Sequence, residues 1–287
     1  MAQPRTYKEN DTTSRTYENR KEKERTQHLI LAQSPLWILS VLLVMQTGIL
    51  RSWSDAEYFL FSLTIASPSI LIPALLLSYR TKSHGYSYWL KLNIWVFIVV
   101  CFGTYFGTHY FFDLMGMRYT FDVVEDGKCC KWHLESDILG QHRDPRQTVP
   151  LFMYLLTHAY FMPYFCILLV AEREIVKRLR FDGTVGKGLA VLFLSYSLAF
   201  AETFVMASPL LEDLFAYEDR SKMLKVGSLG YASYFVVGLP MVKRIDTKTC
   251  EGDNQNWTLA RVVIEALATC MGILLLLEVW AKVVGPL

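Results

Sequence analysis

The chain has 287 residues, of which 52% are hydrophobic and 20% charged, with a mean hydropathy of +0.24 and a formal net charge of +2. A soluble domain usually carries more charge and fewer uninterrupted apolar runs, and a charge this small and dispersed argues against a nucleic-acid-binding protein. The apolar residues fall into blocks of about 16 to 23 residues, close to the length that crosses a hydrocarbon core of ~30 Å. We therefore predict an all-α, polytopic membrane helix bundle with about seven transmembrane helices.

The chain begins with a hydrophilic segment that has no apolar core of its own. Residues 1–33 alternate basic and acidic side chains with Thr and Asn, which is typical of a disordered tail. Residues 34–287 are predicted to form the transmembrane domain. Its seven expected spans are Pro35–Leu50, Tyr58–Tyr79, Leu92–Phe112, Val149–Val170, Leu189–Met206, Val226–Met241 and Val262–Val284.

A polar insertion interrupts the transmembrane domain at about residues 122–147. It contains Cys129, Cys130, His133 and His142, residue types that bind zinc, but their spacing fits no standard finger pattern. A surface loop is the better interpretation, and no metal site is predicted.

The basic residues favour one orientation in the membrane. Of the 29 Lys and Arg residues, 19 lie in the N-terminal segment and the loops expected on its side. Because cytoplasmic loops carry the excess of Lys and Arg, the N-terminus is predicted to be cytosolic and the C-terminus to face the other side.

Two expected spans contain the same polar pattern, Tyr-x-x-Thr-His. The third span has Tyr105, Thr108 and His109. The fourth span has Tyr154, Thr157 and His158, in the same spacing. Residues four apart share a face of an α-helix, so each Tyr is expected beside its His. Ionisable groups in a span are costly and often functional, although a helix-to-helix hydrogen bond is an equal alternative for each His.

The fifth span carries a carboxylate, Glu202, about one turn from its non-cytosolic end. His109 is expected at a similar depth, and His158 lies nearer the middle of its span. The small residues Ser195 and Ala199 share a face with Glu202 and leave room for a ligand or a closely packed helix. These groups are predicted to converge on one pocket in the non-cytosolic half. A structural ion pair is the alternative for Glu202.

Motifs for common cofactors are not found in the sequence. It has no nucleotide-binding loop, no histidine box of the iron-oxygenase type and no G-x-S-x-G elbow. We therefore predict neither a cofactor nor a metal, and chemistry that requires only protons.

The chain closely resembles the cycloeucalenol cycloisomerase family of sterol-biosynthesis enzymes from about Pro35 to its C-terminus. The long charged tail and the insertion are departures from that family. The residues that carry the resemblance are Tyr105-Phe106, Thr108-His109-Tyr110-Phe111-Phe112, Tyr119-Thr120-Phe121, Thr157-His158, Arg178-Leu179-Arg180, Leu194-Ser195-Tyr196, Glu202-Thr203, Asp219-Arg220-Ser221, Pro240-Met241, Arg261-Val262 and Gly285-Pro286.

The resemblance implies opening of the 9β,19-cyclopropane ring of a cyclopropyl sterol, converting cycloeucalenol to obtusifoliol in the endoplasmic reticulum membrane. A carboxyl group in a dry pocket keeps its proton, which suits Glu202 as the acid. His109 or His158 is the expected base, or tunes the acid. The expected substrate-binding residues are Tyr105, Thr108, Tyr154, Thr157, Tyr196, Phe106 and Phe112.

Two other functions are compatible with the sequence. A Δ8–Δ7 sterol isomerase of the emopamil-binding type would use similar proton chemistry. A non-enzymatic transporter would also place ionisable residues within its spans.

Overall fold

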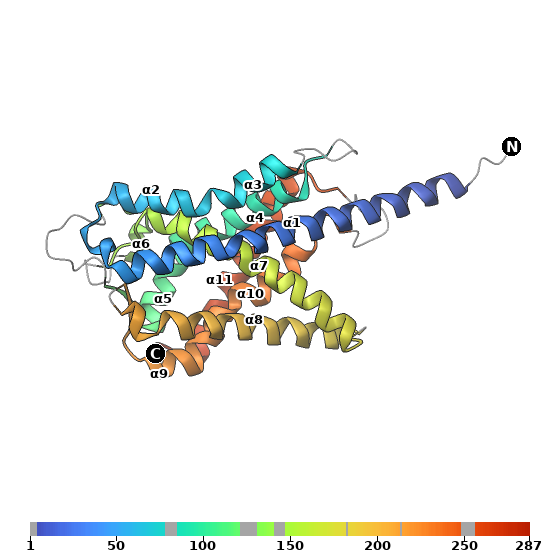
Figure 1. Cartoon of the computed structure of the whole chain (residues 1–287). Helices are drawn as coiled ribbons and strands as arrows, with labels where there is room; N and C mark the ends of the chain where they lie inside the picture. The colour runs from blue at the N-terminus through green and yellow to red at the C-terminus, as the bar shows by residue number, and fades with distance from the viewer. Residues whose placement is uncertain are drawn as a thin grey trace.

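The chain folds as a bundle of long helices, shown in Figure 1, a computed structural model. It describes residues 5–77, 85–120, 131–140, 147–181, 183–212, 214–247 and 256–287, with side chains from residue 18 onward. Within these described residues, six helices are long and apolar enough to cross a membrane, which confirms the predicted polytopic all-α bundle. They are Glu18–Thr47, Asp55–Leu76, Tyr88–Met115, Phe152–Arg178, Thr184–Met206 and Leu259–Val284.

The described residues also include turns and a two-stranded sheet between the helices. The long helices are α1 (Arg5–Thr47), α2 (Asp55–Ala66), α3 (Pro68–Leu76), α4 (Tyr88–Phe102), α5 (Thr108–Met115), α7 (Phe152–Arg178), α8 (Thr184–Met206), α10 (Ser228–Lys243) and α11 (Leu259–Val284). Shorter pieces are α6 (Asp137–Gly140), α9 (Arg220–Lys222), the 3₁₀ turns Ile49–Ser52 and Pro209–Leu211, and the π-helical turns Gly103–Gly107 and Met223–Gly227.

The expected sixth span corresponds to α10, which differs from the other long helices. It has 16 residues and is not among the six helices that satisfy the length and hydropathy of a span. Most of its side chains are buried, and it packs against α8, α11 and α7. A helix enclosed by other helices needs no lipid-facing apolar surface, which explains its Ser, Gly and Tyr content.

The N-terminal segment also differs from the sequence prediction of a disordered tail through residue 33. Helix α1 is continuous from Arg5 into the first apolar block. Its polar side chains are tied to the bundle: Asn19 donates to Asn256 at 3.1 Å and Lys23 donates to Thr247 at 2.7 Å. The Tyr88 N–H donates to Glu22 at 2.7 Å. These partners lie far along the chain, so a local composition pattern does not reveal them.

A buried ion pair holds the bundle together at the end where α1 enters. The Lys91 ammonium on α4 donates to both oxygens of Asp246 at 2.8 and 2.9 Å, and both side chains are almost fully buried. Asp246 also accepts the Trp257 N–H at 2.7 Å. One carboxylate therefore joins α4 to the connection between α10 and α11.

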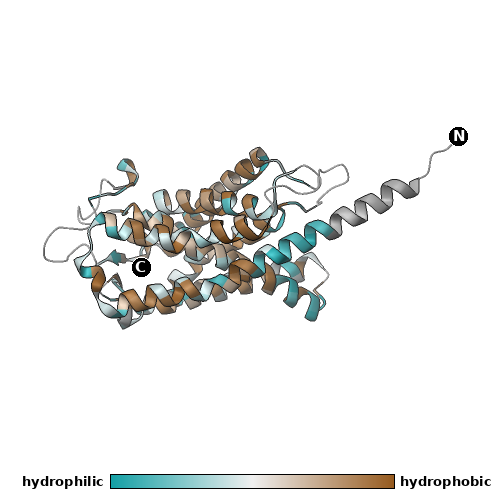
Figure 2. Ribbon diagram, turned by 45° about the horizontal axis from the view of Figure 1, so that its top comes forward, coloured by the Kyte–Doolittle hydropathy of each residue, from teal (hydrophilic) through white to brown (hydrophobic). Residues whose placement is uncertain are grey.

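Hydropathy follows this arrangement (Figure 2). Hydrophobic residues dominate the middle of the helices, whereas hydrophilic residues mark α1 where it leaves the bundle. Successive long helices run in opposite directions along the bundle, as expected for a chain that crosses back and forth (Figure 1).

The other end of the bundle carries a two-stranded antiparallel sheet. Strand β1 (Met117–Tyr119) pairs with β2 (Phe215–Tyr217), with Met117 opposite Tyr217 and Tyr119 opposite Phe215. The described part of the predicted insertion lies here too, since Lys131 N–H donates to Asp55 at 3.0 Å. Cys129, Cys130 and His142 fall outside the described residues.

Candidate functional site

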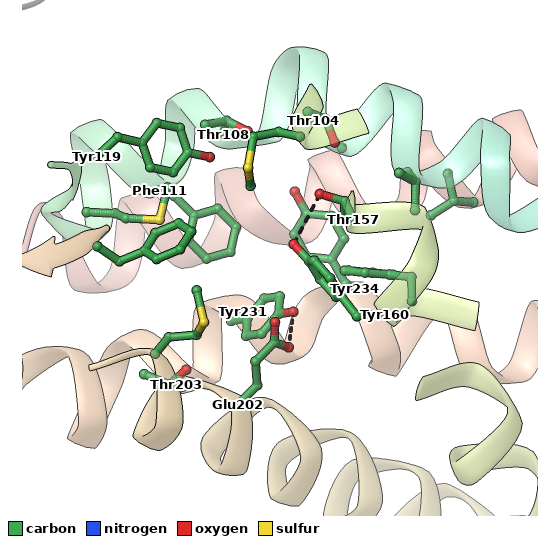
Figure 3. Close-up of a pocket in the computed structure, with 18 of the residues that line it drawn as sticks. Thr104, Thr108, Phe111, Tyr119, Thr157, Tyr160, Glu202, Thr203, Tyr231 and Tyr234 are labelled. Atoms are coloured by element: carbon green, nitrogen blue, oxygen red, sulfur yellow. Dashed lines mark hydrogen bonds between the residues drawn. The ribbon is translucent and has the colours of Figure 1, made fainter. Parts of the chain in front are cut away.

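A cavity opens at the end of the bundle that carries the sheet. Its wall comes from α4, the π turn Gly103–Gly107, α5, β1, α7, α8, β2 and α10 (Figure 3). Counted with its open mouth, the cavity has a volume of about 700 Å³. The space within it that the centre of a water-sized sphere can reach is about 90 Å³, so the cavity is a narrow, open pocket rather than a large enclosed chamber.

The sheet forms one wall of this cavity through the alternation of its side chains. Met117 and Tyr119 of β1 and Phe215 and Tyr217 of β2 all line the cavity. Successive residues of a strand point to opposite faces, and Arg118 accordingly lies outside, paired with Glu218. Burial raises the pKa of Tyr119 and of Tyr217, so both hydroxyls keep their protons at neutral pH.

Glu202 supplies the carboxyl group of the cavity wall. It lies on α8, one turn before the helix ends at Met206, and its side chain is half-buried. The Tyr231 hydroxyl on α10 donates a hydrogen bond to Glu202 Oε2 (Figure 3). This hydrogen bond joins α10 to the end of α8 at the cavity wall.

Aromatic rings and hydroxyls make up much of the remaining wall. The Tyr160 hydroxyl lies 3.1 Å from Thr157 Oγ1, and both residues line the cavity (Figure 3). The Tyr231 ring packs edge-on against Phe111, with centroids 5.3 Å apart. Such ring faces attract a cationic centre by about 0.5–2 kcal/mol each.

Two glycines allow the Tyr234 ring to approach the backbone of the third span. A Cβ added at Gly103 would lie 2.9 Å from Tyr234 Cε1, and one added at Gly107 would lie 1.9 Å from Tyr234 Oη. Both glycines belong to the π-helical turn that separates α4 from α5. A side chain at either position would displace the Tyr234 ring, which lines the cavity.

Three of the ten residues predicted for the site line the cavity: Thr108, Thr157 and Glu202. His109 follows Thr108 on α5 and is buried, but it is not part of the cavity wall. Tyr105 lies within the π turn, where the centroids of its ring and the Phe106 ring are 4.6 Å apart. A π turn changes the four-residue spacing that the sequence pattern assumed, which removes the basis for placing Tyr105 beside His109.

His158 lies apart from the cavity, between α7 and α4. Its Nε2 is 3.3 Å from Asn93 Oδ1, and Asn93 Nδ2 donates to the carbonyls of Ser69 and Trp89 at 3.2 and 2.9 Å. Because the amide nitrogen faces carbonyls, Oδ1 is the acceptor and His158 donates from Nε2. This contact joins three helical segments, as the alternative of a helix-to-helix hydrogen bond expects.

The other four predicted residues also lie outside the cavity wall. The Tyr154 hydroxyl donates to the Leu134 carbonyl at 2.7 Å. The Phe112 ring packs edge-on against the ring of Tyr119, with centroids 5.2 Å apart, but only Tyr119 lines the cavity. The ring centroids of Tyr196 and Phe200, both on α8, lie 6.1 Å apart. Those of Phe106 and Phe102 lie 4.8 Å apart.

The sequence reasoning missed Tyr231 and Tyr234 on α10. They are three residues apart, which places them on neighbouring positions of one helix face. The sequence signal was present as Tyr-x-x-Tyr, but the expected span that carries it, Val226–Met241, was one of the two shortest.

The sequence of the chain is similar to that of a known protein. No family model and no solved structure matches the chain. The chain is 31% identical over 268 residues to the protein named cycloeucalenol cycloisomerase of Arabidopsis thaliana, covering 90% of this chain and 85% of that protein. Identity at this level extends over nearly the whole length of both proteins. The chain therefore belongs to the cycloeucalenol cycloisomerase family of isomerases.

Proposed function

We propose that this chain opens the 9β,19-cyclopropane ring of a cyclopropyl sterol and leaves a Δ8 sterol with a new angular methyl group. The relative in Arabidopsis thaliana is named for cycloeucalenol, whose product in this reaction is obtusifoliol. The observation that supports the proposal most directly is Glu202, a carboxyl group in an aromatic-lined cavity.

The reaction needs one proton delivered and one proton removed. A proton adds to the cyclopropane methylene, carbon 19, as its bond to carbon 9 breaks, and positive charge develops at carbon 9. Loss of the proton on carbon 8 then forms the double bond between carbons 8 and 9. No net oxidation or reduction takes place, so an acid and a base suffice.

Glu202 acts as the acid in this proposal. Its carboxyl group lies in the cavity wall, whereas His109 and His158 do not. Carbon 8 and carbon 19 are both bonded to carbon 9, so the carboxylate left after proton delivery lies close to the proton that must leave. We therefore assign the removal of that proton to Glu202 as well.

The aromatic wall stabilises the cation that forms between the two proton transfers. Phe111, Phe161, Tyr160 and Tyr231 surround the same cavity as Glu202. Ring faces stabilise positive charge without reacting with it, and they exclude the water that would trap a carbocation.

The enzyme is proposed to lie in the endoplasmic reticulum membrane with its N-terminus in the cytosol. The distribution of Lys and Arg supports that orientation. The cavity then opens near the luminal side of the bilayer, with the hydrophilic part of α1 on the opposite side.

Conversion in heavy water tests the proposed reaction. Microsomes that contain the protein are given cycloeucalenol in deuterium oxide, and the product is expected to carry one deuterium in the new methyl group. Parallel incubation with a Δ8 sterol tests for double-bond isomerisation to Δ7. Conversion of the Δ8 sterol alone, or an unlabelled Δ8 product in the first turnover of enzyme equilibrated with deuterium oxide, would contradict the proposal.

Substitution of Glu202 tests the assignment of the acid. Glu202→Gln keeps the shape of the side chain but removes the transferable proton. Turnover is expected to fall about 10²–10⁴-fold, the usual contribution of a positioned acid or base. Sterol binding should change little, and wild-type turnover would exclude Glu202 as the acid.

A further inference from the structure

We propose that Tyr231 is a positioning residue that determines which oxygen of Glu202 carries the transferable proton. The proposal rests on the proposed function of Glu202 as the acid. Its basis is the hydrogen bond from the Tyr231 hydroxyl to Glu202 Oε2, which joins α10 to α8 inside the cavity wall.

The argument begins with the two oxygens of a neutral carboxyl group. One oxygen carries the proton and the other is a carbonyl oxygen, the better hydrogen-bond acceptor. A donor fixed at Oε2 therefore favours the form in which Oε1 carries the proton. The Oε1–H bond is then the one that breaks as the proton moves to carbon 19, and the Tyr231 O–H bond stays intact.

The same hydrogen bond assists the transfer itself. As the proton leaves Glu202, negative charge develops on the carboxylate, and the bond from Tyr231 becomes charge-assisted and roughly twice as strong. An interaction that strengthens toward the transition state raises kcat rather than ground-state binding.

The Tyr231 hydroxyl is held in place by the packing of its ring. The side chain is 6% exposed, and its ring lies 5.3 Å from Phe111 and 5.4 Å from Phe235. A buried ring on a helix loses little freedom when its hydroxyl binds. Tyr231→Phe keeps these ring contacts and removes only the oxygen, so the fold is expected to survive.

Tyr110 offers a matched control. Its hydroxyl hydrogen-bonds to Glu278 on α11, the same kind of tyrosine–glutamate contact, but neither residue lines the cavity. Tyr110→Phe therefore removes a comparable hydrogen bond away from the proposed chemistry.

The test compares sterol turnover by the full-length protein and its variants in membranes. Tyr231→Phe is expected to lower kcat about 100-fold, as does loss of one preorganised donor in other enzymes, with little change in KM. Its solvent deuterium isotope effect on kcat should rise, because proton transfer becomes more fully rate-limiting. Tyr110→Phe should change kcat by less than about twofold.

A double-mutant cycle shows whether Tyr231 acts through Glu202. Glu202→Asp keeps an acid but withdraws its oxygens from Tyr231 by one methylene. In that background Tyr231→Phe should cost far less than its factor in the wild type, because the hydrogen bond is already lost.

Three results would overturn the proposal. They are an unchanged kcat in Tyr231→Phe, a rise in KM alone, or the same loss of kcat from Tyr231→Phe in the wild type and in the Glu202→Asp variant. Wild-type activity in Glu202→Gln would instead contradict the proposed function, so the two failures are distinguishable.

Discussion

Gly107 provides the most direct test of how the cavity wall is packed. Its missing side chain makes room for Tyr234, because an added Cβ would lie 1.9 Å from Tyr234 Oη and 3.2 Å from Cζ. Non-bonded heavy atoms normally lie about 3.5 Å apart or more. Gly107→Ala must therefore displace the end of the Tyr234 ring by more than an ångström.

The ring has little space into which it can move. Tyr234 is 5% exposed and lies 6.2 Å from Phe161 and 5.9 Å from Tyr231, measured between ring centroids. Overpacking of this kind costs about 1–3 kcal/mol, while replacement of glycine in a helix returns up to about 1 kcal/mol. When the full 1 kcal/mol is returned, the net loss is up to about 2 kcal/mol, or a Tm lower by up to a few degrees.

Thermal unfolding of the detergent-solubilised protein measures this loss. Gly188→Ala is the matched control, since an added Cβ at Gly188 on α8 meets no atom within 4 Å. It should leave Tm unchanged or raise it slightly. Tyr234→Phe removes the atom in the closest contact and should restore most of the stability of Gly107→Ala. Equal Tm values for the two alanine variants, or no recovery in the double variant, would refute this account.

Other predictions follow from particular contacts. Lys91→Met leaves the buried Asp246 without its cation and should destabilise the protein by about 3–5 kcal/mol. Recovery in Lys91→Met/Asp246→Asn, whose amide oxygen still accepts the Trp257 N–H, checks by urea or thermal unfolding that the unpaired charge is the cause. Tyr217→Ala should raise KM for the sterol because its side chain lines the cavity, whereas Ala216→Ser, on the outer face of β2, should leave kcat/KM unchanged; equal effects would contradict the register of the sheet. Asn93→Leu should lower Tm by removing the contacts among α3, α4 and α7, and an unchanged Tm would show that these contacts add no stability.

The sequence was sufficient to predict the helical bundle because hydrophobic length is a local property. Blocks such as Val262–Val284 are readable without knowledge of any partner, and α11 occupies that block. Glu202 was identifiable for the same reason: a carboxylate within an apolar run is conspicuous wherever the helix packs.

Helix rotation and backbone irregularity were not readable in this way. The shared Tyr-x-x-Thr-His pattern suggested two equivalent sites, yet Thr108 and Thr157 line the cavity while the histidines beside them do not. The π turn at Gly103–Gly107 alters the register of the first copy. Tyr231 becomes a partner of Glu202 only when α10 is packed against α8, and that contact depends on the whole bundle.

In the sheet β1–β2, backbone hydrogen bonds hold this wall of the cavity together, whereas the side chains determine the chemistry of its surface. Its two strands are joined by backbone pairing, as in the opposition of Arg118 and Ala216, so the ladder does not depend on which side chains the strands carry. Substitutions at the four inward positions can therefore change the shape of the cavity while the backbone pairing of the two strands is kept. Under the proposed function, changes at these four positions can alter which sterol the cavity accepts while Glu202 keeps its place on α8.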